Sequence, residues 1–300
     1  MTLHPANSAR FDRPTLLIVG CGDIGMRVAA ILRGRWRLIA LTSDASRVAA
    51  LRQAGSQPIV GDLDDPATLS RLAGLADALL HLAPPPSSGQ RDTRTRNLLG
   101  ALSRRSRLRC IVYASTSGVY GDCGGASVDE TRPLQPRTER AQRRVDAEAQ
   151  LRWFGRAFCV RVSVLRVPGI YATDRPGGHP RERLLGSTPV LRSQEDVYTN
   201  HIHADDLARA CVAALVRGKP QRAVNASDDT QLLMGDYFDL AADLCGLPRP
   251  PRITREQAAA SLSTMQLSFM DESRRLVNRR LKTELRVRLR YPSVRQGLLA

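Results

Sequence analysis

The stretch 15-TLLIVGCGDIGMRVAAILR-33 decides the fold. An apolar run over 15–20 predicts a buried strand, and residues 25–33 have the apolar spacing of a helix. The turn between them, 20-GCGDIG-25, has the glycine spacing G-x-G-x-x-G. A glycine-rich turn that ends a strand and opens a helix is the pattern that binds a dinucleotide.

Each glycine of this turn has its own reason to be there. Gly20 permits a tight turn, Gly22 lets the backbone approach a pyrophosphate, and Gly25 lets the helix pack closely on the strand. The helix then directs its first N–H groups and the positive end of its dipole at the phosphates. The predicted phosphate-binding residues are Gly20, Cys21, Gly22, Asp23, Ile24 and Gly25.

The same alternation continues through the first half of the chain. Further apolar runs predict buried parallel strands at 37–42, 57–62, 76–83 and 109–115. Segments with helical spacing separate them, at 44–54, 65–73 and 90–106. This order predicts an α/β fold of Rossmann type, with a doubly wound parallel sheet and right-handed crossovers.

The pattern loosens after a long helix at about 138–155 and a sixth strand at 159–167. Helices are expected near 203–217, 231–245, 256–263 and 274–285. We therefore expect a dinucleotide-binding Rossmann domain over 1–168 and a smaller, mostly C-terminal substrate lobe over 169–300. This boundary is approximate, because the two parts can share one core.

The composition narrows the class of protein. The formal net charge is +16, but only Lys219 and Lys282 are lysines, and the arginines are spread along the chain without a nucleic-acid-binding motif. We therefore expect a solvated arginine-rich surface and no nucleic-acid partner. No apolar run approaches the ~18 residues of a membrane span, so no membrane partner is expected. A homodimer is left open.

The location follows from the first residues and the cysteines. The first fourteen residues lack the apolar core of a secretory signal. The six cysteines form no Cys-x-x-Cys pair and have no metal-ligand spacing. These features predict a cytoplasmic protein with reduced thiols and no metal site.

The end of the second strand bears on the choice of cofactor. A carboxylate directly after Leu41 would bind the ribose 2′-hydroxyl of NAD, but the chain has Thr42 there. Ser43 and Arg47 could instead hold a 2′-phosphate by hydrogen bonding and charge. Asp44 would favour NAD, although it is better interpreted as a helix cap. The sequence thus favours NADP over NAD.

Two more strand ends supply candidate cofactor contacts. In 61-GDLDDP-66, Asp62 could accept a hydrogen bond from the adenine amino group, while Asp64 and Asp65 suit a turn and a cap. His81 could be a catalytic base, but within 78-ALLHLA-83 a buried strand histidine beside the cofactor is the favoured interpretation. The predicted contacts from these two strands are Asp62, Leu63, His81, Leu82 and Ala83.

Six stretches of the sequence occur in one characteristic order. They are 20-GCGDIG-25, 61-GDL-63, 80-LHLA-83, 111-IVYASTSGVYG-121, 165-LRVPGIYA-172 and 201-HIHADDLARA-210. Together they cover about residues 15–210. In this order the chain resembles the extended, epimerase/dehydratase-like branch of the short-chain dehydrogenase/reductase superfamily, including members catalogued as atypical.

The resemblance implies roles for residues that spacing alone does not assign. Thr116, four residues before the Tyr of V-Y-G, would polarise the substrate. Ala114 and Ser115 would lie against the nicotinamide ribose, and the backbone at Val167 and Pro168 would pass the nicotinamide. It also makes 200–206 the entrance to a helix, although Asn200, His201 and His203 invite a metal interpretation.

The sequence departs from this family at two places. Extended members usually carry G-x-x-G-x-x-G, and the place of the first glycine is taken by Val19. The second departure concerns the family's catalytic Tyr-x-x-x-Lys, which occurs nowhere in the chain. Aligning the acid that follows that motif with Glu148 puts Arg144 in place of the lysine and Arg140 in place of the tyrosine.

Arginine cannot replace tyrosine in proton transfer, because its guanidinium stays charged. Arg140 could still polarise a carbonyl or bind an anionic group, and Arg144 could contact ribose hydroxyls. The sequence therefore favours an NAD(P)-dependent oxidoreductase or epimerase/dehydratase-like protein acting on an unknown small molecule, with Thr116, Arg140 and Arg144 as its catalytic residues. The alternative is a dinucleotide-binding sensor or regulatory protein with weak or no turnover.

Overall fold

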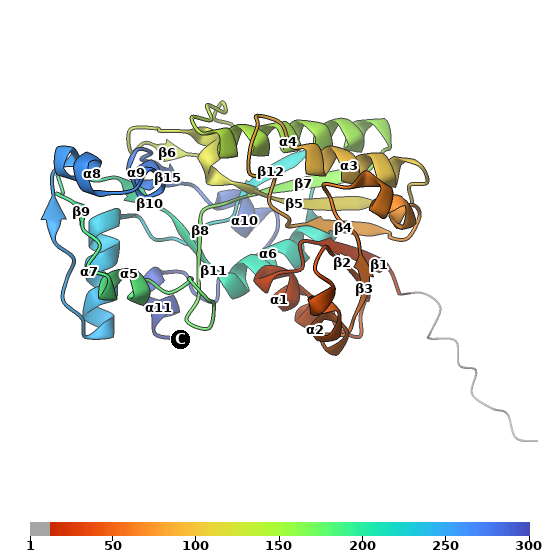
Figure 1. The fold of residues 1–300 in the computed structure, drawn as a ribbon, viewed down its shortest axis with the longest axis horizontal. Helices are drawn as coiled ribbons and strands as arrows, with labels where there is room; N and C mark the ends of the chain where they lie inside the picture. The colour runs from red at the N-terminus through yellow and green to blue at the C-terminus, as the bar shows by residue number, and fades with distance from the viewer. Residues whose placement is uncertain (1–12) are drawn as a thin grey trace, which may run out of the picture.

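A computed structural model describes residues 13–300, and its centre is a parallel sheet of seven strands (Figure 1). The strand order is β12-β7-β5-β4-β1-β2-β3. The strands are β1 (Thr15–Val19), β2 (Arg37–Thr42), β3 (Ser56–Val60), β4 (Ala78–His81), β5 (Cys110–Thr116), β7 (Arg161–Val167) and β12 (Arg222–Asn225). The order reverses direction at β1, as in a doubly wound sheet. The predicted α/β Rossmann-type fold is confirmed.

Helices cover both faces of this sheet. One face is covered by α1 (Asp23–Leu32) and α6 (Ala204–Arg217), whose apolar residues form one core cluster with the sheet. The other is covered by α3 (Thr93–Ser103) and α4 (Glu139–Ala157), which lie side by side along the top of Figure 1. Two clusters of buried residues therefore lie on opposite faces of one sheet.

Shorter elements complete this half of the molecule. The expected helix at 44–54 begins as the 3₁₀ turn η2 (Ala45–Arg47) and continues as α2 (Val48–Gln53). The one expected at 65–73 is 3₁₀ throughout, as η3 (Pro66–Leu72). Asp44 and Asp65 cap these turns by accepting hydrogen bonds from the backbone N–H groups of Ser46 and Ala67. Both predicted caps are confirmed.

The smaller lobe has its own apolar core. It is built mainly on α7 (Met234–Cys245), with Tyr237 and Phe238 among its buried residues. Around it lie β8 (Gly169–Tyr171), α5 (Arg181–Leu185), β9 (Val190–Leu191), β10 (Tyr198–Thr199), β11 (His201–His203), β13 (Leu232–Leu233), β14 (Arg252–Ile253), α8 (Arg255–Ser261), α9 (Thr264–Met270) and α11 (Val294–Leu298). The division at residue 168 stays a prediction, since α6 and β12 of the second half belong to the large sheet's layers.

The expected helix at 274–285 is wrong in its first half. Arg275–Leu276 forms β15, which pairs in parallel with β6 (Ser127–Val128), and only Arg279–Thr283 is helical, as α10. The reason is tertiary, because the N–H groups of Arg275 and Val277 bond to carbonyl oxygens of the 126–128 segment. Backbone pairing to a distant segment overrides the local helical spacing.

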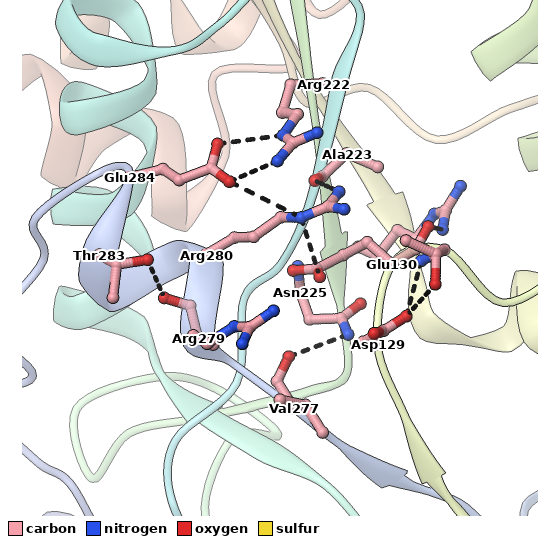
Figure 2. Close-up of polar contacts among 12 residues, drawn as sticks. Asp129, Glu130, Arg222, Ala223, Asn225, Val277, Arg279, Arg280, Thr283 and Glu284 are labelled. Atoms are coloured by element: carbon pink, nitrogen blue, oxygen red, sulfur yellow. Dashed lines mark hydrogen bonds and ion pairs between the residues drawn. The ribbon is translucent and has the colours of Figure 1, made fainter.

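Figure 2 shows how α10 is fixed to the edge of the sheet. Arg280 donates to the carbonyl oxygen of Ala223 on β12 and lies 3.4 Å from the Glu130 carboxylate. Glu284 accepts two hydrogen bonds from Arg222. The backbone N–H of Asn225, at the end of β12, donates to the carboxylate of Glu130. This network joins segments that are about 150 residues apart in sequence.

Candidate functional site

The phosphate loop has the geometry that its glycines predict. Gly20 has φ +82°, and a Cβ there would lie 2.4 Å from the backbone nitrogen of Ala83. A Cβ on Gly25 would lie 3.3 Å from Ile18, so α1 packs closely on β1. A Cβ on Gly22 would meet nothing within 4 Å. The space beside Gly22 and the N-terminus of α1, which has no side-chain cap, fit a bound pyrophosphate.

Charged side chains surround the start of α1. Asp23, in its first turn, pairs with Arg27 one turn later and with Arg175 from the segment after β8. The first turn of this helix therefore carries a carboxylate within ion-pair distance of two arginines. No sequence motif marks Arg175, and sequence reasoning missed it.

The adenosine side of the loop carries another arginine. Arg47 donates a 2.8 Å hydrogen bond from Nη2 to the carbonyl oxygen of Cys21, so its guanidinium lies on the glycine-rich turn. Thr42 bonds with the backbone of Asp44, and Ser43 is exposed. The Asp44 carboxylate is occupied by the N–H and hydroxyl of Ser46, and these bonds lower its pKa.

The end of β3 presents a carboxylate to solvent. Asp62 is exposed, and its Oδ1 accepts a hydrogen bond from the N–H of Asp64. The side chain of Asp64 forms two hydrogen bonds with Arg94 of α3, at 2.6 and 2.9 Å. Leu63 is buried below them. The other carboxylate oxygen of Asp62 is thus left for a ligand.

His81 lies inside the sheet and bonds to α3. It is 1% exposed, and its Nε2 is 2.9 Å from the hydroxyl of Thr95, which itself donates to Asp92. Burial, with the charge of Arg144, lowers the pKa of His81 to about 3. A histidine with this pKa stays neutral near pH 7. Leu82 and Ala83 follow it and pack against Gly20.

Thr116 ends β5 and caps the short helix η4 (Ser117–Tyr120). Its Oγ1 accepts a 3.2 Å hydrogen bond from the N–H of Gly118. Because the oxygen is the acceptor there, the hydroxyl proton remains available to a ligand. Gly118 also lies near Ala141 in the first turn of α4, so Thr116 and the start of α4 face the same space.

The side chain of Ser115 points into the interior, toward α4. It is 5% exposed and donates a 2.7 Å hydrogen bond to Glu148 of α4. Glu148 also receives Arg166 of β7 at 2.9 Å, and Arg166 donates to the hydroxyl of Tyr120. This chain of contacts fixes α4 relative to β5 and β7. Ser115 therefore supports the wall of the site through its side chain, while Ala114 contributes its backbone.

Arg144 is directed into the same wall. Its Nη1 donates to the carbonyl oxygen of Ala114 at 2.8 Å and to the hydroxyl of Tyr113 at 3.0 Å. Its guanidinium also lies 5.5 Å from the centre of the Tyr113 ring. Arg144 therefore places a fixed positive charge beside the end of β5.

Arg140 lies one turn earlier and has no partner. Within residues 13–300, its guanidinium forms no hydrogen bond or ion pair, and its neighbours Arg143 and Arg144 are both cationic. Partial burial, with the charges of Arg144 and Arg143, lowers the pKa of Arg140. Its side chain is nevertheless exposed enough to meet a ligand. An unpaired guanidinium beside two others favours an anionic ligand.

No buried tyrosine is activated for proton transfer. Burial raises the pKa of Tyr120 to about 12 and raises the pKa values of Tyr113, Tyr171 and Tyr237 as well. These four phenols therefore keep their protons near pH 7.

Residues 273–275 bind the loop at 121–125, and no sequence pattern suggested this contact. Arg274 donates to the carbonyl oxygen of Gly121, Asp122 accepts from the N–H of Ser273, and Arg275 donates to the carbonyl oxygen of Gly125. Val167 is buried at the end of β7, and Pro168 leads into β8. No short-range pattern could predict contacts between residues 150 or more positions apart.

Among residues 13–300, no cluster of three or more His, Cys, Asp or Glu side chains has an arrangement that could hold a metal ion. In the same part of the chain, no helix is both long and apolar enough to span a membrane.

Comparison with known proteins gives one family and many similar structures. The model of the NAD dependent epimerase/dehydratase family matches residues 16–227. A functionally unknown conserved protein from Silicibacter pomeroyi DSS is 32% identical, with a TM-score of 0.81 over 96% of this chain and 97% of that one. No curated protein matches the chain.

More distant structures carry names of enzymes. UDP-glucose 4-epimerase from Thermotoga maritima, solved with UDP-glucose, is 19% identical, with a TM-score of 0.76 over 95% of this chain and 96% of that one. UDP-glucuronic acid 4-epimerase from Bacillus cereus, solved with NAD, is 19% identical, with a TM-score of 0.73 over 95% and 96%. At these identities the similarity shows the fold alone.

Proposed function

Because the chain belongs to the NAD-dependent epimerase/dehydratase family, we propose that it binds NAD(P) and transfers hydride to or from a small anionic molecule. The observation that carries this proposal is the unpaired guanidinium of Arg140, in the first turn of α4, which begins next to the loop that follows Thr116. A free cation at the position of the family's tyrosine suits a substrate with a carboxylate or phosphate.

The bound dinucleotide would supply hydride chemistry, and the residues of this chain would supply position and charge. The glycine-rich turn and the N-terminus of α1 would hold the pyrophosphate. Thr116 would donate a hydrogen bond from its hydroxyl to the reacting oxygen, and Arg140 would stabilise negative charge that develops there. Arg144 contributes a second fixed charge behind the Ala114 carbonyl. In this proposal the proton that accompanies hydride transfer is exchanged with solvent.

We propose NADP as the preferred cofactor. The support is Arg47, whose guanidinium is held on the glycine-rich turn by its bond to the Cys21 carbonyl. It lies beside the end of β2, where Ser43 is exposed and Asp44 is engaged in its capping bonds. An arginine and a hydroxyl at this place suit a 2′-phosphate.

The function is tested by binding and turnover with one protein preparation. NADPH and NADH binding is measured by fluorescence, and turnover is followed by absorbance with carbonyl and nucleotide-sugar compounds. We expect NADPH binding and hydride transfer that Thr116→Ala reduces by roughly 10²-fold or more. Thr131→Ala, at an exposed threonine outside the site, is the matched control. Turnover that Thr116→Ala leaves intact would contradict the assignment of Thr116.

A second candidate function is a dinucleotide-binding sensor with weak or no turnover. The observation that favours it is the raised pKa of each of the four buried tyrosines, which leaves the site without an activated phenol. Micromolar or tighter NADPH binding with no hydride transfer to any compound tested would decide for this function.

We also propose a cytoplasmic homodimer, with 169–300 as its substrate lobe. Each described cysteine is a free thiol, which suits a reducing compartment.

The support for a dimer is Trp153, 61% exposed on α4, beside an apolar depression of about 560 Å³ that Leu99 and Phe158 line. Light scattering should give twice the chain mass, and Trp153→Glu should give the monomer.

A further inference from the structure

Arg175 lies where the segment after β8 meets the phosphate loop. Its Nε is 3.1 Å from Asp23 Oδ2 in the first turn of α1, an ion-pair contact without the geometry of a hydrogen bond, and its Nη1 donates to the carbonyl oxygen of Ile170. Within residues 13–300, neither Nε nor Nη2 has a hydrogen-bond acceptor. The guanidinium is therefore held beside the start of α1 with donors left for a ligand.

The neighbouring arginine is already fully engaged. Arg27 binds Asp23, Asp174 and Asp205, and these carboxylates raise its pKa against the effect of its burial. Asp174 comes from the same segment as Arg175, and Asp205 from the start of α6. Arg27 therefore fixes this segment on α1, and each of its three nitrogens already binds a carboxylate. Arg175 has one carboxylate contact and is the less engaged of the two cations.

We infer that Arg175 binds the pyrophosphate of the dinucleotide and so couples cofactor binding to the segment 172–185 of the substrate lobe. This inference rests on the proposed dinucleotide binding. A pyrophosphate at the N-terminus of α1 lies beside the Asp23 carboxylate, which would repel it. An arginine between the two neutralises one and donates to the other.

The coupling follows from where Arg175 is attached. Its backbone leads directly to α5, and its Nη1 bond ties it to the end of β8. A phosphate that draws the guanidinium toward the loop adds a contact between the cofactor and this segment. The segment should therefore open less often when the cofactor is bound.

The test uses ADP-ribose, which carries the pyrophosphate, and adenosine, which lacks it. Arg175→Gln should weaken ADP-ribose and NADPH binding by about tenfold or more, as expected for a lost charge-assisted hydrogen bond. Adenosine binding, measured by ligand-observed NMR, should not change. Arg181→Gln is the matched control, because it removes the same charge from an exposed position in the same segment.

A second variant separates ligand contact from docking. Asp174→Asn breaks a bond to Arg27 but keeps Arg175, so ADP-ribose binding should stay within about threefold of wild type. Hydrogen exchange of 172–185 should slow with ADP-ribose in wild type and in Asp174→Asn, but not in Arg175→Gln. Equal weakening in the two variants would show that Arg175 acts through docking alone and would overturn the inference.

The experiment distinguishes a failure of the proposed dinucleotide binding from a failure of the role assigned to Arg175. If wild type binds neither NADPH, NADH nor ADP-ribose, the dinucleotide proposal falls, and the inference falls with it. If wild type binds and Arg175→Gln binds as tightly as Arg181→Gln, only the assignment of Arg175 is overturned.

Discussion

Arg166 and Glu148 form an ion pair in the interior of the protein, with Nη2 2.9 Å from Oε2 and Nε 3.2 Å from Oε1. The two side chains are 4% and 3% exposed. The pair joins β7 to α4, and through the hydroxyl of Ser115 it also reaches β5. The placement of Arg140 and Arg144 above the sheet edge therefore depends on a contact one or two turns further along the same helix.

Removing one partner of this ion pair should destabilise the fold more than replacing both partners with apolar residues. Glu148→Gln leaves the Arg166 charge buried without its counter-ion, and we expect a loss of roughly 3–5 kcal/mol in the free energy of unfolding. The double variant Glu148→Leu, Arg166→Met should recover much of that loss. Urea unfolding measures both. A double variant as unstable as Glu148→Gln would contradict this explanation.

The control for that experiment is a partly exposed arginine on the same helix that also contacts Glu148. Arg152 lies 3.4 Å from Glu148 and is 31% exposed. Arg152→Ala should therefore change the free energy of unfolding by less than about 1 kcal/mol.

Two glycines of the phosphate loop should separate folding from ligand binding. Gly22→Ala places a methyl group in open space, so the unfolding free energy should change by less than about 1 kcal/mol. NADPH binding should nevertheless weaken by about tenfold or more, because the methyl group occupies the approach of the pyrophosphate. Calorimetry and fluorescence titration measure the two effects.

Gly20→Ala is the contrasting variant. It puts a side chain at φ +82° and a Cβ 2.4 Å from the Ala83 nitrogen, so it should destabilise the fold by at least about 1–2 kcal/mol even without ligand. If Gly22→Ala destabilised the protein as much, the space beside Gly22 would have a structural role instead.

Substitution of Arg47 should test whether this residue makes the protein bind NADPH more tightly than NADH. Arg47→Ala removes the cation from the side of the loop that faces the end of β2, so NADPH binding should weaken by about tenfold while NADH binding changes little. Arg52→Ala, in the next helical turn and without a role at the loop, is the control. Equal weakening of NADPH and NADH would mean that Arg47 supports the loop through the Cys21 carbonyl and does not select the cofactor.

Asp228 should make stability depend on pH. Burial raises its pKa to about 7, against about 3.9 in an unfolded chain, although the N–H of Thr230 and the hydroxyl of Tyr171 oppose the shift. Between these values the folded protein keeps a proton that the unfolded chain has lost. Stability therefore falls as the pH rises through this window and levels off above about 7.

Asp228→Asn removes this dependence, because an amide does not titrate. The free energy of unfolding of the variant relative to wild type should rise by roughly 1.4 kcal/mol per pH unit from pH 5 to 7. The effect of His201, whose pKa burial lowers to about 4, is present in both proteins and cancels in the difference. A pH-independent difference would show that Asp228 is ionised in the folded protein.

Local patterns were enough to predict the large sheet and the phosphate loop. The strand at 15–19 and its glycine turn carry their own signal, because a buried parallel strand is apolar throughout and the turn needs glycine. The strand β12 was missed, since Arg222–Asn225 is short and has only two apolar residues. It joins the sheet because its backbone pairs in parallel with β7, and no local sequence pattern indicates that pairing.

Sequence patterns place candidate site residues where the backbone alone defines their position, and not where distant side chains meet. Spacing places Thr116 at the end of a strand and Arg140 and Arg144 on one face of a helix. Arg175 reaches Asp23 across about 150 residues, and no period or motif encodes that approach. Such contacts follow from the order of the strands and could not be read before the topology was known.

The attachment of residues 273–275 to the loop at 121–125 has a consequence for biosynthesis. Strands β1, β2, β3, β4, β5 and β7 of the large sheet are complete once residue 167 has left the ribosome, but the loop at 121–125 gains its bonds to residues 273–275 only when Arg275 has been made. These six strands can therefore collapse early, while this loop is completed only in about the last tenth of translation. If the chain binds a dinucleotide as proposed, a nascent chain stalled before residue 270 should bind it while this loop is incomplete.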